Sequence, residues 1–158
     1  RDAMQWLETI FSQLWGCLMQ PFYERQALCF CCTRCGRCCM TRGDYYVFLS
    51  EQEAERIRNY LQLSRSWFRR RYLERLEEGE LVAAAGKGDR CIFLNAAGHC
   101  RVYPVRPVQC RTYPFWPEIV GNARAWRQEA RRCEGINRGA VVPVGKIRRA
   151  VKACSGQQ

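Results

Sequence analysis

Four cysteines lie within eight residues of this 158-residue chain, and they are the side chains with the clearest chemistry. They are Cys32, Cys35, Cys38 and Cys39, spaced as C-x2-C-x2-C-C. Thiolates at this density hold a metal, pair as disulfides or react. A spacing of two residues lets successive sulfurs face one point, and Gly36 permits a tight turn between them. Neighbouring arginines favour thiolate over thiol, so we interpret the run as metal-binding.

A second set of four cysteines is spread over the following chain, with 8, 9 and 22 residues between successive members. They are Cys91, Cys100, Cys110 and Cys133. Taken singly, each is typical of a small buried hydrophobic residue. Each also lies at the edge of a predicted element, where a loop can direct the sulfur inward. The two sets make eight thiolates, enough for two centres of four or one larger shared centre.

The adjacent pair Cys38 and Cys39 suggests how the eight divide. Because neighbouring side chains diverge, we expect these two thiolates to ligate different metals, so the first set would divide between two centres. Four further cysteines are expected not to be ligands: Cys17, Cys29, Cys31 and Cys154. His99, the single histidine, lies in a predicted turn and is either a surface residue or a metal or proton-transfer group.

The cysteines and their neighbours together resemble a known family. The motifs are F-x-C-x2-C-G-x-C-C at 30–39, C-I-F-L at 91–94, C-R-V-Y at 100–103, R-P-x2-C-R-x-Y-P-F at 106–115 and C-x-G-I at 133–136. This combination is similar to the YkgJ-type cysteine-cluster family, described as zinc- or iron-chelating. The resemblance implies that the eight cysteines are the ligands. It also implies a link to flagellin lysine N-methylase, but this chain is much shorter and has no methyltransferase glycine motif, so we do not transfer that activity and leave enzyme status open.

Sulfur ligation disfavours magnesium and calcium and leaves iron, zinc or another metal. C-x2-C-x2-C is the bacterial ferredoxin arrangement around a four-iron cluster, although Met40, not a proline, follows Cys39 here. Zinc usually takes two C-x2-C knuckles, and the chain has one such run. We therefore expect one or two 4Fe-4S clusters, with zinc as the alternative.

Arg106 and Arg111 flank Cys110 in a proline-rich segment that should be irregular or extended. They are expected to be cofactor-binding groups that donate hydrogen bonds to ligand sulfurs or cluster sulfides. The competing interpretation is surface salt bridging. The sequence contains no P-loop, dinucleotide glycine pattern or HExxH motif, so it identifies no reaction.

The elements that must position these side chains are short. Apolar periodicity predicts a helix over residues 4–20, and Ser50 with Glu53 forms a capping box for another. Further helices are predicted from Ser64 or Ser66 through Leu76, within 122–132 and over 143–154. Short strands are predicted at 45–49, 81–85, 91–94 and 100–103.

These elements predict a small, irregular, metal-stabilised α+β domain with several helices and Pro-rich loops. We expect three parts: an N-terminal amphipathic helix at 1–22, the cysteine-cluster domain at 23–140 and a basic C-terminal helix at 141–158. The first helix could pack on the domain, bind a partner or lie on a membrane surface.

The net charge is +11, and residues 101–158 hold 12 Lys and Arg against three acidic residues. Such asymmetry fits a protein partner, which could be acidic, or simply a solvated surface. No motif supports nucleic-acid binding.

No apolar stretch reaches the roughly 20 residues of a membrane span. Cysteine usage without a visible secretory signal predicts a reducing, cytoplasmic location. Two function classes remain: a metal protein for electron transfer or catalysis, and a structural metal domain that binds a partner.

Overall fold

The computed structural model describes residues 20–40 and 46–156. Short helices and two-stranded antiparallel sheets make up the described chain. This arrangement confirms the predicted small α+β class. No helix in the described part of the chain is long and apolar enough to cross a membrane.

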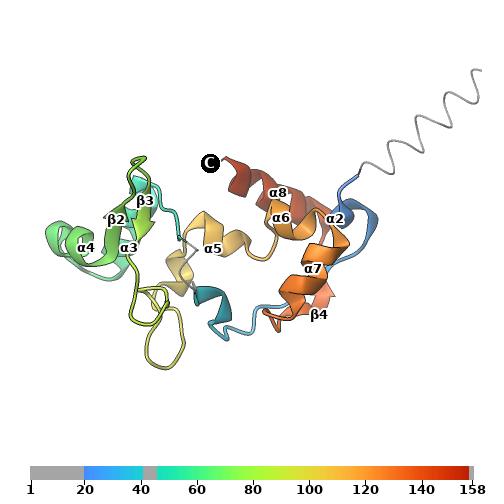
Figure 1. The fold of residues 1–158 in the computed structure, drawn as a ribbon, viewed down its shortest axis with the longest axis horizontal. Helices are drawn as coiled ribbons and strands as arrows, with labels where there is room; N and C mark the ends of the chain where they lie inside the picture. The colour runs from blue at the N-terminus through green and yellow to red at the C-terminus, as the bar shows by residue number, and fades with distance from the viewer. Residues whose placement is uncertain (1–19, 41–45, 157–158) are drawn as a thin grey trace, which may run out of the picture.

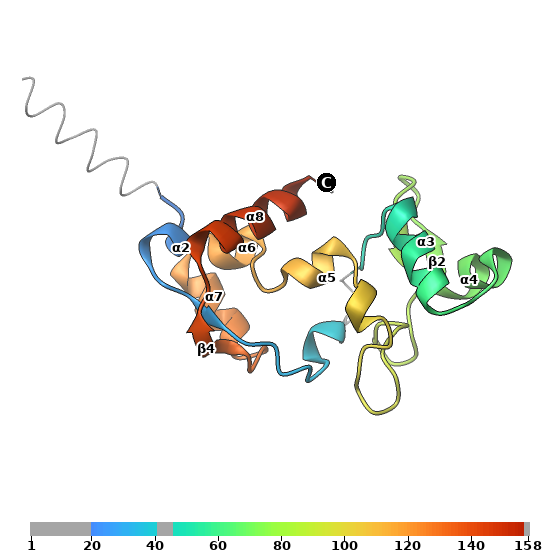
Figure 2. The same ribbon diagram turned by 180° about the vertical axis from the view of Figure 1, so that it is seen from behind.

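The elements fall into two groups with helix α5 (Val108–Thr112) between them. Figure 1 and the view from behind in Figure 2 both show this separation. We call 46–105 the first lobe and 20–30 with 113–156 the second lobe. Segments 31–40 and 106–112 connect the two, and we call them the bridge.

The first lobe packs two helices against a small sheet. Its elements are α3 (Glu51–Tyr60), α4 (Arg65–Tyr72), β2 (Leu73–Arg75), β3 (Leu81–Ala83) and the 3-10 helix η2 (Tyr103–Val105). Ser50 and Glu53 form the predicted capping box at the start of α3. The core contains Ile57 and Phe68, and the Phe68, Tyr72 and Phe93 rings stack on one another.

The second lobe joins chain segments from both ends of the described sequence. Its elements are α2 (Phe22–Arg25), β1 (Cys29–Phe30), α6 (Pro117–Val120), α7 (Ala123–Ala130), β4 (Ile136–Val141) and α8 (Val144–Ser155). Strand β1 pairs antiparallel with β4. Trp126 and Ile147 are buried in a separate hydrophobic core, so α7 and α8 pack inward through one face each.

Local sequence signals gave α3, α7, α8 and β3 correctly, but several other predictions are wrong. The chain turns from helix to strand at Leu73 because β2 pairs with β3 there, so the helix does not continue to Leu76. The predicted strands at 91–94 and 100–103 are instead a hairpin loop. It is held by the isolated β-pairing of Leu94 with Cys100 and by the Arg101 amide, which donates to the Phe93 carbonyl over 2.8 Å. Segment 108–112, expected to be irregular or extended, is helix α5.

One further predicted strand does not form. The described part of 45–49 contains only the isolated β-pairing of Phe48 with Val82. The predicted helix at 4–20 falls almost wholly outside the described residues, and the division into three parts stays a prediction.

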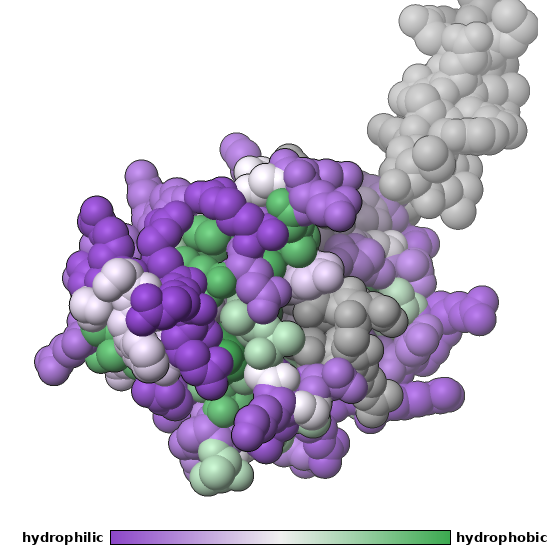
Figure 3. Space-filling model, turned by 60° about the vertical axis from the view of Figure 1, so that its left-hand side comes forward, coloured by the Kyte–Doolittle hydropathy of each residue, from purple (hydrophilic) through white to green (hydrophobic). Residues whose placement is uncertain are grey.

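On the face in Figure 3, apolar residues form a band bordered by hydrophilic residues.

Candidate metal centre

The eight predicted ligand cysteines all line one cavity of about 560 Å³. Segments 31–40 and 106–112 supply five of these cysteines, the first lobe two and the second lobe one: Cys32, Cys35, Cys38, Cys39, Cys110, Cys91, Cys100 and Cys133. All of them are free thiols. Cysteines separated by up to about a hundred positions in the sequence therefore line the same space.

The cysteine run takes its shape from close backbone packing. At its start, the Cys31 amide donates to the Gly135 carbonyl over 3.0 Å. Gly36 has φ +74°, and a Cβ there would lie 2.3 Å from the Gly98 carbonyl oxygen. Only glycine satisfies both conditions, so the run turns at Gly36 into the 3-10 helix η1 (Arg37–Cys39).

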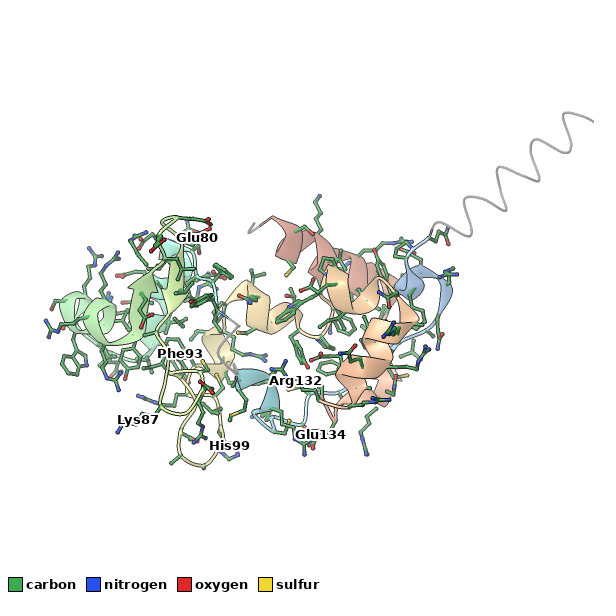
Figure 4. All side chains as sticks on the ribbon, viewed as in Figure 1. Glu80, Lys87, Phe93, His99, Arg132 and Glu134 are labelled. Atoms are coloured by element: carbon green, nitrogen blue, oxygen red, sulfur yellow. The ribbon has the colours of Figure 1, made fainter. Side chains whose placement is uncertain are left out.

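The run is attached to both lobes. Toward the first lobe, the Cys91 amide donates to the Cys39 carbonyl over 2.7 Å. Toward the second, Arg132 donates to the Met40 carbonyl over 3.0 Å and Arg37 pairs with Glu134 over 3.4 Å. Figure 4 shows Arg132 and Glu134 beside η1. The run therefore closes one side of the space between the lobes.

Three cysteines outside the run have sulfurs that accept backbone N–H groups. Cys91 accepts from Phe93, Cys100 from Val102 and Cys133 from both Gly135 and Ile136. Burial raises the pKa of all three thiols, and each N–H contact offsets part of that rise, because an N–H donor stabilises the thiolate. The backbone around each sulfur is thus arranged for a negatively charged ligand atom.

Helix α5 places Cys110, and side chains fasten this helix on both sides. The buried Glu53 carboxylate accepts the Val108 amide over 2.7 Å. The Gln109 side chain accepts from the Phe48 amide over 2.8 Å and donates to the Tyr46 carbonyl over 3.1 Å. On the second-lobe side, the Trp116 indole donates to the Gln109 carbonyl over 2.9 Å.

Burial holds several of these thiols in the protonated form when no metal is present. It raises the pKa of Cys91 to about 11 and raises the pKa values of Cys100 and Cys110 as well. A metal that binds these sulfurs must displace their protons, so its apparent affinity depends on pH.

Cys38 and Cys39 are within hydrogen-bonding reach of each other. The Cys39 thiol donates to Cys38, which lowers the Cys38 pKa to about 7 and raises that of Cys39. Their sulfurs therefore lie close together, contrary to the expectation that neighbouring side chains diverge. That the two cysteines ligate different metals stays a prediction.

Electrostatic interactions divide the sulfurs into two groups. Cys39 interacts with Cys91 and Cys100, and Cys110 interacts with Cys91, Cys100 and Cys38. On the other side, Cys133 interacts with Cys35. Among the described residues, no three Cys, His, Asp or Glu side chains are already placed to hold one metal ion. The donor set has the right chemistry, but the thiolates must move closer together to ligate one ion.

The predicted arginines and histidine also line this cavity. The Arg106 charge adds to the lowering of the Cys38 pKa and offsets part of the rise that burial causes at Cys100 and Cys110. Arg111 is exposed at the cavity, and its role toward the metal stays a prediction, as does that of His99. Sequence reasoning missed Arg132, whose charge lowers the pKa of Cys38. Its position next to Cys133 is the signal that could have identified it.

A tyrosine beside Cys133 was also missed. The Tyr113 hydroxyl donates to Glu129 over 2.5 Å and contacts the Cys133 sulfur. Burial and then Glu129 raise the Tyr113 pKa, so the hydroxyl stays a hydrogen-bond donor. Cys29, Cys31 and Cys154 do not line the cavity, whereas Cys17 is outside the described residues.

Comparisons with known proteins relate this chain to metal-chelating domains. The CxxCxxCC family, "Putative zinc- or iron-chelating domain", matches residues 31–134. An uncharacterized protein of Methanocaldococcus jannaschii is 28% identical over 89 residues, which are 56% of this chain and 46% of that protein. The matched part of the chain thus spans about half the length of this relative. No solved structure matches it.

Proposed function

Because the chain belongs to the CxxCxxCC family of zinc- or iron-chelating domains, we propose that its eight cavity-lining cysteines hold one or two 4Fe-4S clusters. The observation that carries this proposal is the convergence of all eight sulfurs on one cavity between two separate cores. The centre would serve electron transfer or act as a metal-dependent catalytic or accessory site. We further propose a reducing, cytoplasmic location.

The spread of the sulfurs favours a cluster over single ions. One zinc ion needs four ligand atoms at about 2.0–2.3 Å. A four-iron cluster takes one thiolate at each iron, so its ligands are farther apart and suit sulfurs placed around a cavity wall. We propose that Cys91, Cys100 and Cys110 ligate with one or both of the adjacent cysteines, and that Cys133 ligates with the start of the run.

When bound, a cluster supplies one-electron redox chemistry, and the residues around it set the conditions. Arg106 offsets negative charge at three sulfurs. Arg111 is proposed to do the same at the cavity edge. Because reduction adds negative charge, replacing Arg111 with leucine should lower the reduction potential while leaving metal content nearly intact.

The test is to purify the protein without oxygen, record its absorption and EPR spectra, and count iron, zinc and sulfide per chain. Matched serine variants then assign the ligands. Cys32→Ser should lower metal content, whereas Cys31→Ser, at the neighbouring exposed cysteine, should not. Cys110→Ser should lower it, whereas the half-buried Cys154→Ser should not. Equal metal loss in a control variant and in its matched ligand variant would contradict the assignment.

The alternative is a structural zinc domain that binds a protein partner through its basic surface. The second lobe supports this candidate because it has ten Lys and Arg against four acidic residues. Two of those acids, Glu24 and Glu134, already pair with Arg148 and Arg37. Zinc without sulfide in the oxygen-free preparation, with salt-sensitive binding to an acidic protein, would favour this function over the first.

A further inference from the structure

One part of the cavity wall is built from a tyrosine and two arginines. The Arg34 guanidinium lies 4.4 Å from the centre of the Tyr103 ring, and that of Arg106 lies 3.6 Å from it. All three side chains line the cavity. A guanidinium stacked on a ring uses its face, so its N–H groups remain directed outward in its own plane.

Arg34 differs from the other arginine inside the cysteine run. Arg37 pairs with Glu134, whereas no carboxylate of the described residues pairs with Arg34. Arg34 also has φ +59°, a conformation that costs free energy in a residue with a Cβ. The run thus holds a cation over Tyr103 in the cavity, and no described carboxylate neutralises it.

The cavity has room and chemistry beyond what a metal centre uses. Its volume of about 560 Å³ lies in the range of small-molecule sites, roughly 300–1,000 Å³. A metal centre occupies the space next to the sulfurs, at about 2.3 Å from each. Among the residues that the structure describes, no Asp or Glu lines the cavity, while the rings of Tyr46 and Phe93 give it an apolar wall.

We propose that this cavity binds a small organic anion, with a carboxylate or phosphate group on Arg34 and a planar apolar body against the aromatic wall. The Arg106 charge acts on three of the cysteine sulfurs, so we assign Arg106 to the metal site. Arg34 is then the guanidinium that binds the organic anion. The inference rests on the proposed function in one respect: the metal centre must leave this wall free. A guanidinium recognises both oxyanions, so the probes must distinguish them.

The experiment uses protein with its resident metal and three probes: benzoate, phenyl phosphate and the uncharged benzamide. We expect saturable binding of an anion by calorimetry or ligand-observed NMR, and binding of benzamide weaker by roughly tenfold or more. Arg34→Gln should weaken anion binding by a similar factor and leave benzamide binding unchanged. Arg127→Gln, on the exposed surface of α7, is the matched control and should bind like wild type. Preference between benzoate and phenyl phosphate identifies the oxyanion.

The proposal is overturned if neither anion saturates, if benzamide binds as well as benzoate, or if Arg34→Gln binds anions like wild type. Metal content is measured on each sample. Full metal content without anion binding would reject this inference and leave the proposed function standing. If the purified protein has no metal at the cysteines but binds the anion, and Arg34→Gln abolishes this binding, the proposed function is rejected and the ligand site stands.

Discussion

The two lobes neutralise their charges in different ways. The first lobe has ten Lys and Arg against eight Asp and Glu, and four of its arginines pair with Glu51 or Glu55: Arg58, Arg65, Arg69 and Arg75. The second lobe has ten basic residues and four acids. The bridge has four arginines and no acid. The first lobe thus balances much of its charge internally, whereas the bridge does not.

Cysteine thiolates would supply the negative charge that the bridge lacks. Its arginines Arg34, Arg37, Arg106 and Arg111 line the same cavity as the eight cysteines. A metal–thiolate centre of four thiolates around a dicationic core has a formal charge near −2, which would offset positive charge of the bridge such as that of Arg106. Metal loading and the joining of the lobes should therefore be one event.

Metal removal is therefore expected to have the largest effect. It should lower Tm by more than about 10 °C, because loss of only about 4 kcal/mol has that effect in a chain of this size. The freed thiolates on facing walls would no longer be drawn together, so the radius of gyration should rise. Chelation followed by calorimetry and small-angle scattering tests this. Unchanged Tm and radius would mean that the metal does not join the lobes.

Removing one buried ring from each core tests whether the two lobes unfold in separate transitions. Phe68→Ala in the first lobe and Trp126→Ala in the second remove buried rings, so each should cost about 3–5 kcal/mol. With metal bound we expect one unfolding transition that both variants lower. After chelation we expect two transitions, each moved by one variant.

The exposed neighbour Trp67 provides the control for these deletions, because its side chain is 47% exposed. Trp67→Ala should change the free energy of unfolding by no more than about 0.5 kcal/mol. If both deletions moved the same transition in the chelated protein, the two cores would be a single cooperative unit.

The sequence revealed those parts of the fold that short-range signals determine. The capping box at Ser50 and Glu53 and the periodicity of 122–132 identified their helices. Leu73 and Leu76 also fit a helical stripe, but pairing of Leu73 with Ala83 decides for strand. The β1–β4 pairing joins Cys29 to Val141, and no local pattern reports contacts at that separation.

The candidate site was predictable to the extent that cysteine spacing marks it. All eight chosen cysteines line the cavity, and none of Cys29, Cys31 and Cys154 does. Tyr113 could not be identified in this way, because its contact with Cys133 depends on how the second lobe packs. Its residue type and spacing are also compatible with a core tyrosine.

Removing Glu53 tests how the first lobe holds the bridge. Glu53→Ala leaves the Val108 amide and the Ser50 cap without their acceptor, at a cost of about 1–3 kcal/mol. The exposed Glu74→Ala is the control and should change the free energy of unfolding by no more than about 0.5 kcal/mol. Because Val108 opens the helix that carries Cys110, alkylation of the metal-free Cys110 thiol should also become faster. Faster unfolding with unchanged Cys110 alkylation would show that Glu53 stabilises only its own lobe.

The smallest expected effect concerns the surface charge pairs of the first lobe. Hydrogen bonds from Arg58 hold the pKa of Glu55 at about 2, below its ordinary 4.5. A carboxyl with a lowered folded-state pKa stabilises the fold above pH 4.5, and this contribution disappears as pH falls toward 2. Glu55→Gln should therefore lower Tm slightly at pH 7 and low salt. The Tm difference from wild type should shrink progressively between pH 4.5 and 2, and also in 1 M salt at pH 7, because both side chains lie at the surface. Comparing the two proteins at each pH, both with metal removed, cancels the effect of acid on the metal centre. A difference that stays constant from pH 7 to 2 would mean that Glu55 acts through packing, and that the first lobe's charge balance contributes nothing to its stability at this position.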